Sequence, residues 1–280
     1  MFQFKKISTK FITLAVIALT IAITLTGTIS YFTAKSSIIK KLKTSDLIQI
    51  ASLKASNIDS RIARAIETSN LLANDPTILR WFSEAETNYL LGELVKQKLD
   101  NSITSSEYTY AFAADRNTLN YWKNNSKTSI YLDEANPNNA WFYKTIKTEK
   151  KTQININSDS KNDTYVFINV LMGDIKKPIG VAGVSIRFNQ VAKEFMTTNP
   201  EYDARVWLID NKGKIKITTD VSNINENIGK YTSMEIERSI LSDPSKVSVL
   251  EYENEKGIID IVHVPLEVND WGVVYEVPRS

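Results

Sequence analysis

The chain opens with a long apolar run. Residues 11–32 include no charged side chain and are flanked by Lys10 and Lys35. At about 1.5 Å of rise per residue, a helix of this length spans the roughly 30 Å hydrocarbon core of a bilayer. A cleavable signal peptide is the alternative, but its apolar core is typically about 7–15 residues. The pattern therefore favours an uncleaved transmembrane helix over residues 11–33, after a short cytoplasmic tail of residues 1–10.

A helical stripe follows the apolar run. Residues 34–74 contain no glycine or proline, and Pro76 disfavours helix in the residue before it. We therefore predict one long stalk helix over residues 34–74. Its apolar face can pack on its own domain or on a second copy, so a homodimer through this helix stays open. The apolar positions recur at helical spacing; they are Leu42, Leu47, Ile50, Leu53, Ile58, Ile62, Ala65 and Leu72.

Two copies of one strand pattern follow the stalk. The first copy has a hairpin, a short aromatic helix, three strands and a closing helix from Asn189. The elements before that closing helix are residues 108–113, 118–122, 141–146, 153–157, 164–172 and 179–188. The second copy repeats the order in residues 204–210, 214–218, 234–241, 247–253, 257–264 and 272–277. We therefore predict an α+β fold with two tandem antiparallel-sheet lobes, residues 75–198 and 199–280.

The amino-acid composition argues against several classes of function. Hydrophobic residues are 42% and charged residues 24%, the balance of a globular chain. A net charge of +2 with scattered lysines argues against nucleic-acid binding. There is no cysteine and one histidine, His263, which we expect on the solvent face of a strand. No nucleophile–base pair or metal-ligand cluster is apparent, so we predict a protein that is not an enzyme and needs no metal or cofactor.

The order of elements resembles the double Cache (dCache) sensor domains of bacterial chemoreceptors, histidine kinases and diguanylate cyclases. Trp141 and Phe142 resemble the Trp–Tyr pair on the short helix of that family. The run IGVAGVSI at residues 179–186 resembles its glycine-spaced strand, and WGVVYEVP at residues 271–278 resembles the end of its membrane-proximal lobe. The resemblance covers nearly the whole chain from Phe11. It implies two PAS-like lobes and a small-molecule sensor module of a signalling receptor, with the ligand in the membrane-distal lobe, residues 75–198.

Two positions depart from the amino-acid-binding members of this family. Those members hold the ligand carboxylate with an arginine where this chain has Asn139, and the ligand ammonium with an aspartate where it has Ser185. Without both charges, a buried zwitterion would lack charge-assisted hydrogen bonds. We therefore do not expect an ordinary α-amino acid as ligand and favour a neutral or weakly polar small molecule.

The candidate ligand-binding residues lie in the first lobe. Alternation places Tyr165, Phe167 and Asn169 on one strand face, and a buried Asn169 needs a partner, from the backbone or a ligand. Trp141 is expected mainly to pack the short helix, and Phe142 or Tyr143 to face the cavity. The full set is Tyr110, Phe112, Tyr121, Asn139, Trp141, Phe142, Tyr165, Phe167, Asn169 and Ser185. Tyr110 and Phe112 are equally consistent with core residues that have no role in ligand binding.

The resemblance also implies a location. It predicts a single-pass protein of the inner or plasma membrane, with most of the chain outside the cytoplasm. In the family, a second membrane span and an output domain would follow the position of Ser280, and this chain stops there. The rival interpretation is an anchored structural or adhesion protein, or a stand-alone binding protein, that uses the fold without a ligand; as a spacer it needs no ligand-sized cavity.

Overall fold

The computed structural model describes residues 2–41, 45–104, 108–158, 163–188, 204–218, 220–255 and 257–279. The chain divides into two compact units, Met1–Ile50 and Ala51–Ser280. The boundary expected between the two lobes, and the helix expected from Asn189, lie outside the described residues.

The first unit is dominated by helix α1 (Phe2–Lys41). Its segment Phe11–Ile39 is, among the described residues, the one helical stretch long and apolar enough to cross a membrane by length and composition. The threonines in this stretch do not oppose burial in lipid, because their hydroxyls donate to carbonyls one turn earlier. These bonds run from Thr20, Thr24, Thr26 and Thr28.

The predicted stalk helix corresponds to the end of α1 and to helix α2 (Leu47–Ala73). Residues 42–44 between them lie outside the described part. From Ala51 onward, α2 buries a stripe at three- and four-residue spacing, as an amphipathic helix on a globular domain does. The stripe consists of Ala51, Ala55, Ile58, Ile62, Ala65 and Leu72.

Two shorter helices follow α2. Helix α3 (Pro76–Ser83) begins at Asp75, whose carboxylate accepts from the backbone N–H groups of Thr77 and Ile78. Such an N-cap satisfies amides that have no partner within the helix. Helix α4 (Tyr89–Thr104) buries Val95 and Leu99.

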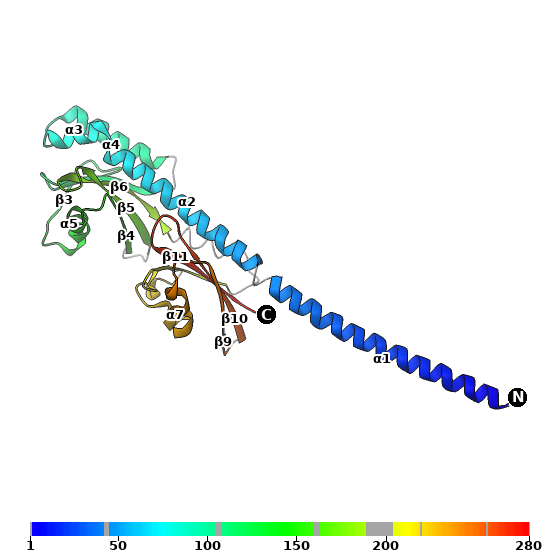
Figure 1. Cartoon of the computed structure of the whole chain (residues 1–280). Coiled ribbons are helices and arrows are strands. Elements are labelled where there is room, and N and C mark those ends of the chain that lie inside the picture. The colour runs from blue at the N-terminus through cyan, green and yellow to red at the C-terminus, as the bar shows by residue number, and fades with distance from the viewer. Residues whose placement is uncertain are drawn as a thin grey trace. The chain divides into compact units, whose positions relative to one another are not determined.

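The first lobe is built on a six-stranded antiparallel sheet of order β3-β2-β1-β6-β5-β4. The helices α2, α3 and α4 lie on one face of this sheet, and α5 (Ala140–Lys147) lies on the other (Figure 1). A short 3₁₀ turn, η2 (Pro137–Asn139), leads into α5. The strands are β1 (Tyr108–Asp115), β2 (Asn120–Lys123), β3 (Ile130–Tyr131), β4 (Thr152–Ser158), β5 (Thr164–Gly173) and β6 (Pro178–Arg187).

The second lobe repeats this topology in a five-stranded sheet of order β8-β7-β11-β10-β9. In each lobe the first strand pairs with its hairpin partner and with the last strand. Helix α7 (Met234–Ser242) packs its buried Ile236 and Ile240 against this sheet. The strands are β7 (Arg205–Asp210), β8 (Ile215–Ile217), β9 (Ser248–Asn254), β10 (Gly257–Pro265) and β11 (Trp271–Pro278). The predicted α+β fold with two antiparallel-sheet lobes is confirmed.

His263 is buried, with 2% of its surface exposed, so its predicted place on a solvent-facing strand surface is wrong. It shares a strand face with Ile259 and Ile261, which belong to the core against α7. Its Nδ1 lies 3.2 Å from the carbonyl oxygen of Lys246, and an added Cβ on Gly272 would lie 2.2 Å from its Nε2. Burial lowers the pKa of the imidazole. The prediction failed because strand alternation does not reveal that α7 and its loop cover this face.

Candidate functional site

One face of the first sheet carries aromatic and amide side chains in neighbouring strands. In the β4–β5–β6 register, Phe167 lies opposite Asn155 and Ser185, and Asn169 lies opposite Gln153 and Gly183. Residues directly opposite in antiparallel strands point to the same face. The polar side chains of the edge strand β4 therefore lie on the same face as Tyr165, Phe167 and Asn169.

This face opens into a cavity of about 1310 Å³, which we call the interlobe cleft. Side chains from both lobes line it. The first lobe contributes Phe112, Tyr121, Trp141, Lys144, Lys150, Gln153, Asn155, Asn157, Phe167 and Asn169. The second lobe contributes Asp210, Asn211, Lys216, Asn225, Val268, Asn269, Asp270 and Trp271. A cavity with an apolar wall and a few convergent polar groups is the usual form of a small-molecule site.

The aromatic wall is a contiguous cluster. The ring of Phe112 lies 5.7 Å from Tyr121, 5.6 Å from Trp141 and 6.3 Å from Phe167, measured between centroids. Tyr121 and Trp141 are 5.7 Å apart in an edge-to-face arrangement. Such pairs add packing energy beyond the area that they bury. Burial raises the pKa of the Tyr121 phenol, so this wall is uncharged at neutral pH.

Among the described residues that line the cleft, Asn169 and Asn269 have buried side-chain polar atoms without a hydrogen-bond partner, and in Asn169 both polar atoms are affected. Asn169 is 1% exposed, and neither its Oδ1 nor its Nδ2 has a hydrogen-bond partner in the described part of the chain. The Oγ of Ser185 on the next strand is likewise buried without a described partner, although Ser185 does not itself line the cleft. A buried polar atom without a partner costs about 1–3 kcal/mol. Both groups therefore call for a ligand or water on this face.

Five of the ten predicted site residues line the cleft: Phe112, Tyr121, Trp141, Phe167 and Asn169. Tyr110 and Tyr165 lie beside them, with Tyr110 stacked on Phe167 at 6.4 Å and 5.6 Å from Tyr165 between centroids. Asn139 is turned toward its own loop, where its Nδ2 donates to the carbonyl of Asp133.

Helix α5 presents a different side chain to the cleft than expected. Phe142 is fully buried in the core, and Tyr143 donates its hydroxyl to the carbonyl of Leu132 at 2.7 Å. Neither lines the cleft; Trp141 and Lys144 do. The three-residue spacing from Trp141 to Lys144 places both on one helical face, whereas adjacent residues point in different directions.

The predicted site residues did not include the polar edge strand or the lysines that line the cleft. Gln153, Asn155 and Asn157 alternate with isoleucines, a pattern that usually indicates a solvent-facing edge. Lys144 and Lys150 are exposed, as most surface lysines are, although both line the cleft. The alternation of polar residues with isoleucines could have pointed to this strand, but it does not show whether the polar face borders solvent or a cleft.

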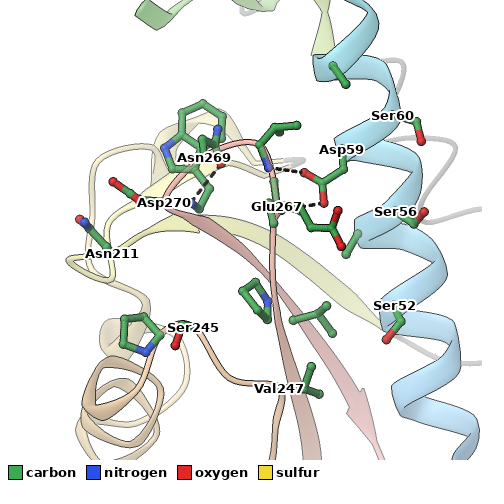
Figure 2. Close-up of a pocket in the computed structure, with 18 residues that line it drawn as sticks. Ser52, Ser56, Asp59, Ser60, Asn211, Ser245, Val247, Glu267, Asn269 and Asp270 are labelled. Carbon is green, nitrogen blue, oxygen red and sulfur yellow. Dashed lines mark hydrogen bonds between the residues drawn. The ribbon is translucent and has the colours of Figure 1, made fainter. Parts of the chain in front are cut away.

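A second cleft of about 920 Å³ lies between α2 and the second lobe. Figure 2 shows the carboxylate of Asp59 on α2 pointing at the turn between β10 and β11. It accepts from the backbone N–H of Glu267 at 2.9 Å and of Val268 at 3.2 Å. This β10–β11 turn, residues 266–270, also borders the interlobe cleft through Val268, Asn269 and Asp270. One short segment therefore separates the interlobe cleft from the cleft along the long helix.

Comparison with known proteins identifies the fold. No protein-family model matches the chain. The periplasmic sensory domain of the Campylobacter jejuni chemoreceptor Tlp1 has a TM-score of 0.66 at 15% identity, covering 86% of this chain and 96% of that domain. The Pseudomonas aeruginosa PctB ligand-binding domain with L-Arg has a TM-score of 0.63 at 15% identity, covering 86% and 96%. The Pseudomonas fluorescens CtaA domain with L-serine has a TM-score of 0.61 at 13% identity, covering 85% and 97%. The dCache resemblance is confirmed as the fold of the chain.

These structures overturn one expectation. Domains with this fold were solved with L-Arg and with L-serine bound, so the exclusion of ordinary α-amino acids as ligands is wrong. It rested on the absence of charges at Asn139 and Ser185 alone. Charge complementarity need not come from those two positions, because Lys144, Lys150 and Asp270 also line the cleft.

Proposed function

We propose that this chain is a membrane-anchored, extracytoplasmic sensor module that binds a small molecule of the amino-acid class in the interlobe cleft. The observation that carries the proposal is the buried, unsatisfied amide of Asn169 in the wall of a ligand-sized cavity. The shared fold with chemoreceptor ligand-binding domains supports it. The function is binding, with no chemical step.

The cleft suits such a ligand chemically. Its aromatic wall offers apolar surface, and Asn169, Gln153 and Asn155 offer uncharged donors and acceptors. Polar groups that converge beside an apolar wall fix the orientation of a ligand and give specificity. The proposed binding residues are the five predicted ones that line the cleft, with Tyr110, Tyr165 and Ser185 supporting them.

The proposed topology is a single pass of the inner or plasma membrane. Residues 11–33 of α1 would form the anchor, and both lobes would lie outside the cytoplasm, with residues 199–280 nearer the membrane. The composition of the helix supports this. A reporter fused after Ser280 should be extracytoplasmic, and the protein should stay in the membrane fraction. A soluble product beginning near Ser30 would instead indicate a cleaved signal peptide.

Ligand binding would act through α2. A ligand shifts a conformational equilibrium only by its difference in affinity for the two states. The helix contacts cleft-forming segments of both lobes, at Ser69 in the first and at Asp59 in the second. Through both contacts, a conformational change in the cleft would be transmitted to α2. A homodimer through this helix remains part of the proposal.

The rival function is an anchored structural protein that uses the fold as a spacer. A spacer gains nothing from a cavity of about 1310 Å³ or from an unsatisfied amide in its wall. These two features favour the sensor.

Binding is tested on the full chain in nanodiscs, by thermal shift with the common L-amino acids and γ-aminobutyrate. A ligand at about 100 times its Kd should stabilise the protein by about 2.7 kcal/mol. Phe167→Ala should weaken binding, while Ile261→Ala, in the second-lobe core, should lower stability and leave affinity nearly unchanged. A natively folded protein that responds to no compound in this panel would contradict the proposed ligand class.

A further inference from the structure

We propose that the cleft selects an amino acid with an uncharged amide side chain, held with that amide against Asn169 and with its charged α-carbon end at the cleft mouth. The inference rests on the proposed function and names the ligand class of the same site. It follows from where charged and uncharged polar groups lie around the cleft.

The side chains directly beside Asn169 are uncharged, and the ammonium of Lys151, just before the edge strand β4, donates to the carbonyl oxygen of Leu171 at 2.7 Å. The neighbours of Asn169 across the strands are Gln153 and Gly183, and the residues two positions away on β5 are Phe167 and Leu171. Placing an ionised group beside these side chains would remove it from water without a counter-charge, which is strongly unfavourable. The interior therefore favours the neutral end of a ligand.

Asn169 requires both a donor and an acceptor from that neutral end. Its Oδ1 accepts and its Nδ2 donates, and both atoms are buried without a described partner. A carboxamide satisfies both atoms at once, since it carries an N–H and a C=O side by side. An apolar side chain satisfies neither. Gln153, directly opposite on β4, supplies a second amide at the same level of the sheet.

The mouth carries charges of both signs. Lys144 on α5 and Lys150 after it are exposed on the first lobe, and Asp270 is exposed on the β10–β11 turn of the second lobe. No ion pair joins any of the three to another described residue. Two cations and an anion on the lining of one cleft suit the carboxylate and ammonium of a zwitterion, whose solvation is only partly lost at exposed positions. The lysines would take the place of the cation that is absent at Asn139.

The geometry thus gives the ligand a direction. The charged end stays near water and between the two lobes, and the amide end enters the first lobe. An amino acid with a carboxylate side chain would bring an anion to Asn169, and one with an alkyl side chain would leave the amide unsatisfied. Both should bind more weakly than the amide of similar length.

The test compares L-glutamine, L-glutamate and L-norleucine by calorimetry on the full chain in nanodiscs, with L-asparagine and L-aspartate as a shorter pair. We expect each amide to bind about tenfold or more tightly than the corresponding acid, and L-glutamine to bind about tenfold or more tightly than L-norleucine. The reason is that the acid and norleucine leave the buried amide of Asn169 unpaired. Asn169→Leu should remove that preference, because the amides lose their partner while norleucine no longer leaves a buried amide unpaired and should bind more tightly than to the unmodified protein. The double variant K144Q/K150Q should weaken all five compounds alike, whereas the exposed Lys176→Gln should change none.

The outcomes separate the two proposals. If the common amino acids fail to bind a folded protein, the proposed ligand class fails and this inference fails with it. If amino acids bind but the amides have no advantage over the acids and norleucine, the sensor stands and the inference is overturned. Should Asn169→Leu not fold, the comparison of compounds on the unmodified protein still decides. Unchanged affinities in K144Q/K150Q would contradict the placement of the ligand's charged α-carbon end beside these two lysines.

Discussion

The hydroxyl of Ser69 on α2 accepts a hydrogen bond from the backbone N–H of Val184 on β6 at 3.1 Å. The same hydroxyl lies 3.2 Å from the carbonyl oxygen of Ile168 on β5, to which it donates. Ile168 directly precedes Asn169, and Val184 lies between Gly183 and Ser185. The long helix is therefore bonded to the backbone of the two strands whose opposite face lines the cleft.

Ser69→Ala should lower the free energy of unfolding by about 1–3 kcal/mol, because it leaves buried backbone groups unpaired. Chemical denaturation of the full chain in detergent measures the change. Ser60→Ala, at an exposed position of the same helix, is the control and should stay within about 0.5 kcal/mol. Equal stabilities of the two variants would mean that the Ser69 bonds do not contribute.

Asp59→Ala should loosen the β10–β11 turn, since the turn loses the acceptor for two of its backbone N–H groups. We expect a loss of about 0.5–1.5 kcal/mol in stability, the usual net contribution of a hydrogen bond whose donor stays accessible to water, and weaker amino-acid binding, because the turn borders the interlobe cleft. Glu267→Gln changes a charge on the same turn at an exposed side chain and is the matched control. Binding that is unaffected by Asp59→Ala would separate the turn from the ligand site.

Asp115 at the end of β1 should make stability depend on pH. Burial raises the pKa of its carboxyl to about 6, and the charge of the nearby Glu86 adds to the increase. The folded protein therefore holds this proton more tightly than the unfolded chain, whose pKa is about 3.9. The resulting stabilisation is complete below that unfolded pKa and is lost as the pH rises through about 6.

The comparison is with Asp115→Asn, which keeps an oxygen to accept from the backbone N–H of Asn117. Relative to this variant, the unmodified protein should gain on the order of 2 kcal/mol between about pH 7.5 and about pH 4. Asp174→Asn is the control, because Asp174 accepts from the residue two positions on in a similar turn but is exposed. Parallel pH profiles for the protein and its Asp115→Asn variant would contradict the assignment.

Gly183→Ala should disrupt the floor of the cleft. An added Cβ would lie 1.9 Å from the backbone oxygen of Ile168 and 2.9 Å from Cζ of Phe112. Backbone must move to relieve the first clash, so we expect a loss of about 1–3 kcal/mol together with loss of binding. Gly27→Ala, where a Cβ meets no atom within 4 Å, should be tolerated. A stable Gly183→Ala variant with normal binding would show that β5 and β6 adjust freely here.

The repeated pattern of hairpin, helix and three strands was readable in the sequence, and so was the long apolar run. Period-two and helical spacing report which side chains of one element are apolar, and this information is local. The face shared by Tyr165, Phe167 and Asn169 followed from the same rule. The family resemblance added the dCache fold, which the comparison with solved structures confirms.

The tertiary structure alone decided what covers each face. The polar residues Gln153 and Asn155 alternate with isoleucines, as on a solvent-facing edge, but they border a cleft. His263 was expected on a solvent-facing surface but lies under α7 and its loop. The cleft itself has walls from both lobes, and its second-lobe wall is bonded to α2 through Asp59 and Glu267, which are 208 positions apart. Local periodicity records that a side chain is polar or apolar; whether the space beside it is water, core or ligand cleft depends on elements far away in the chain, which only folding brings together.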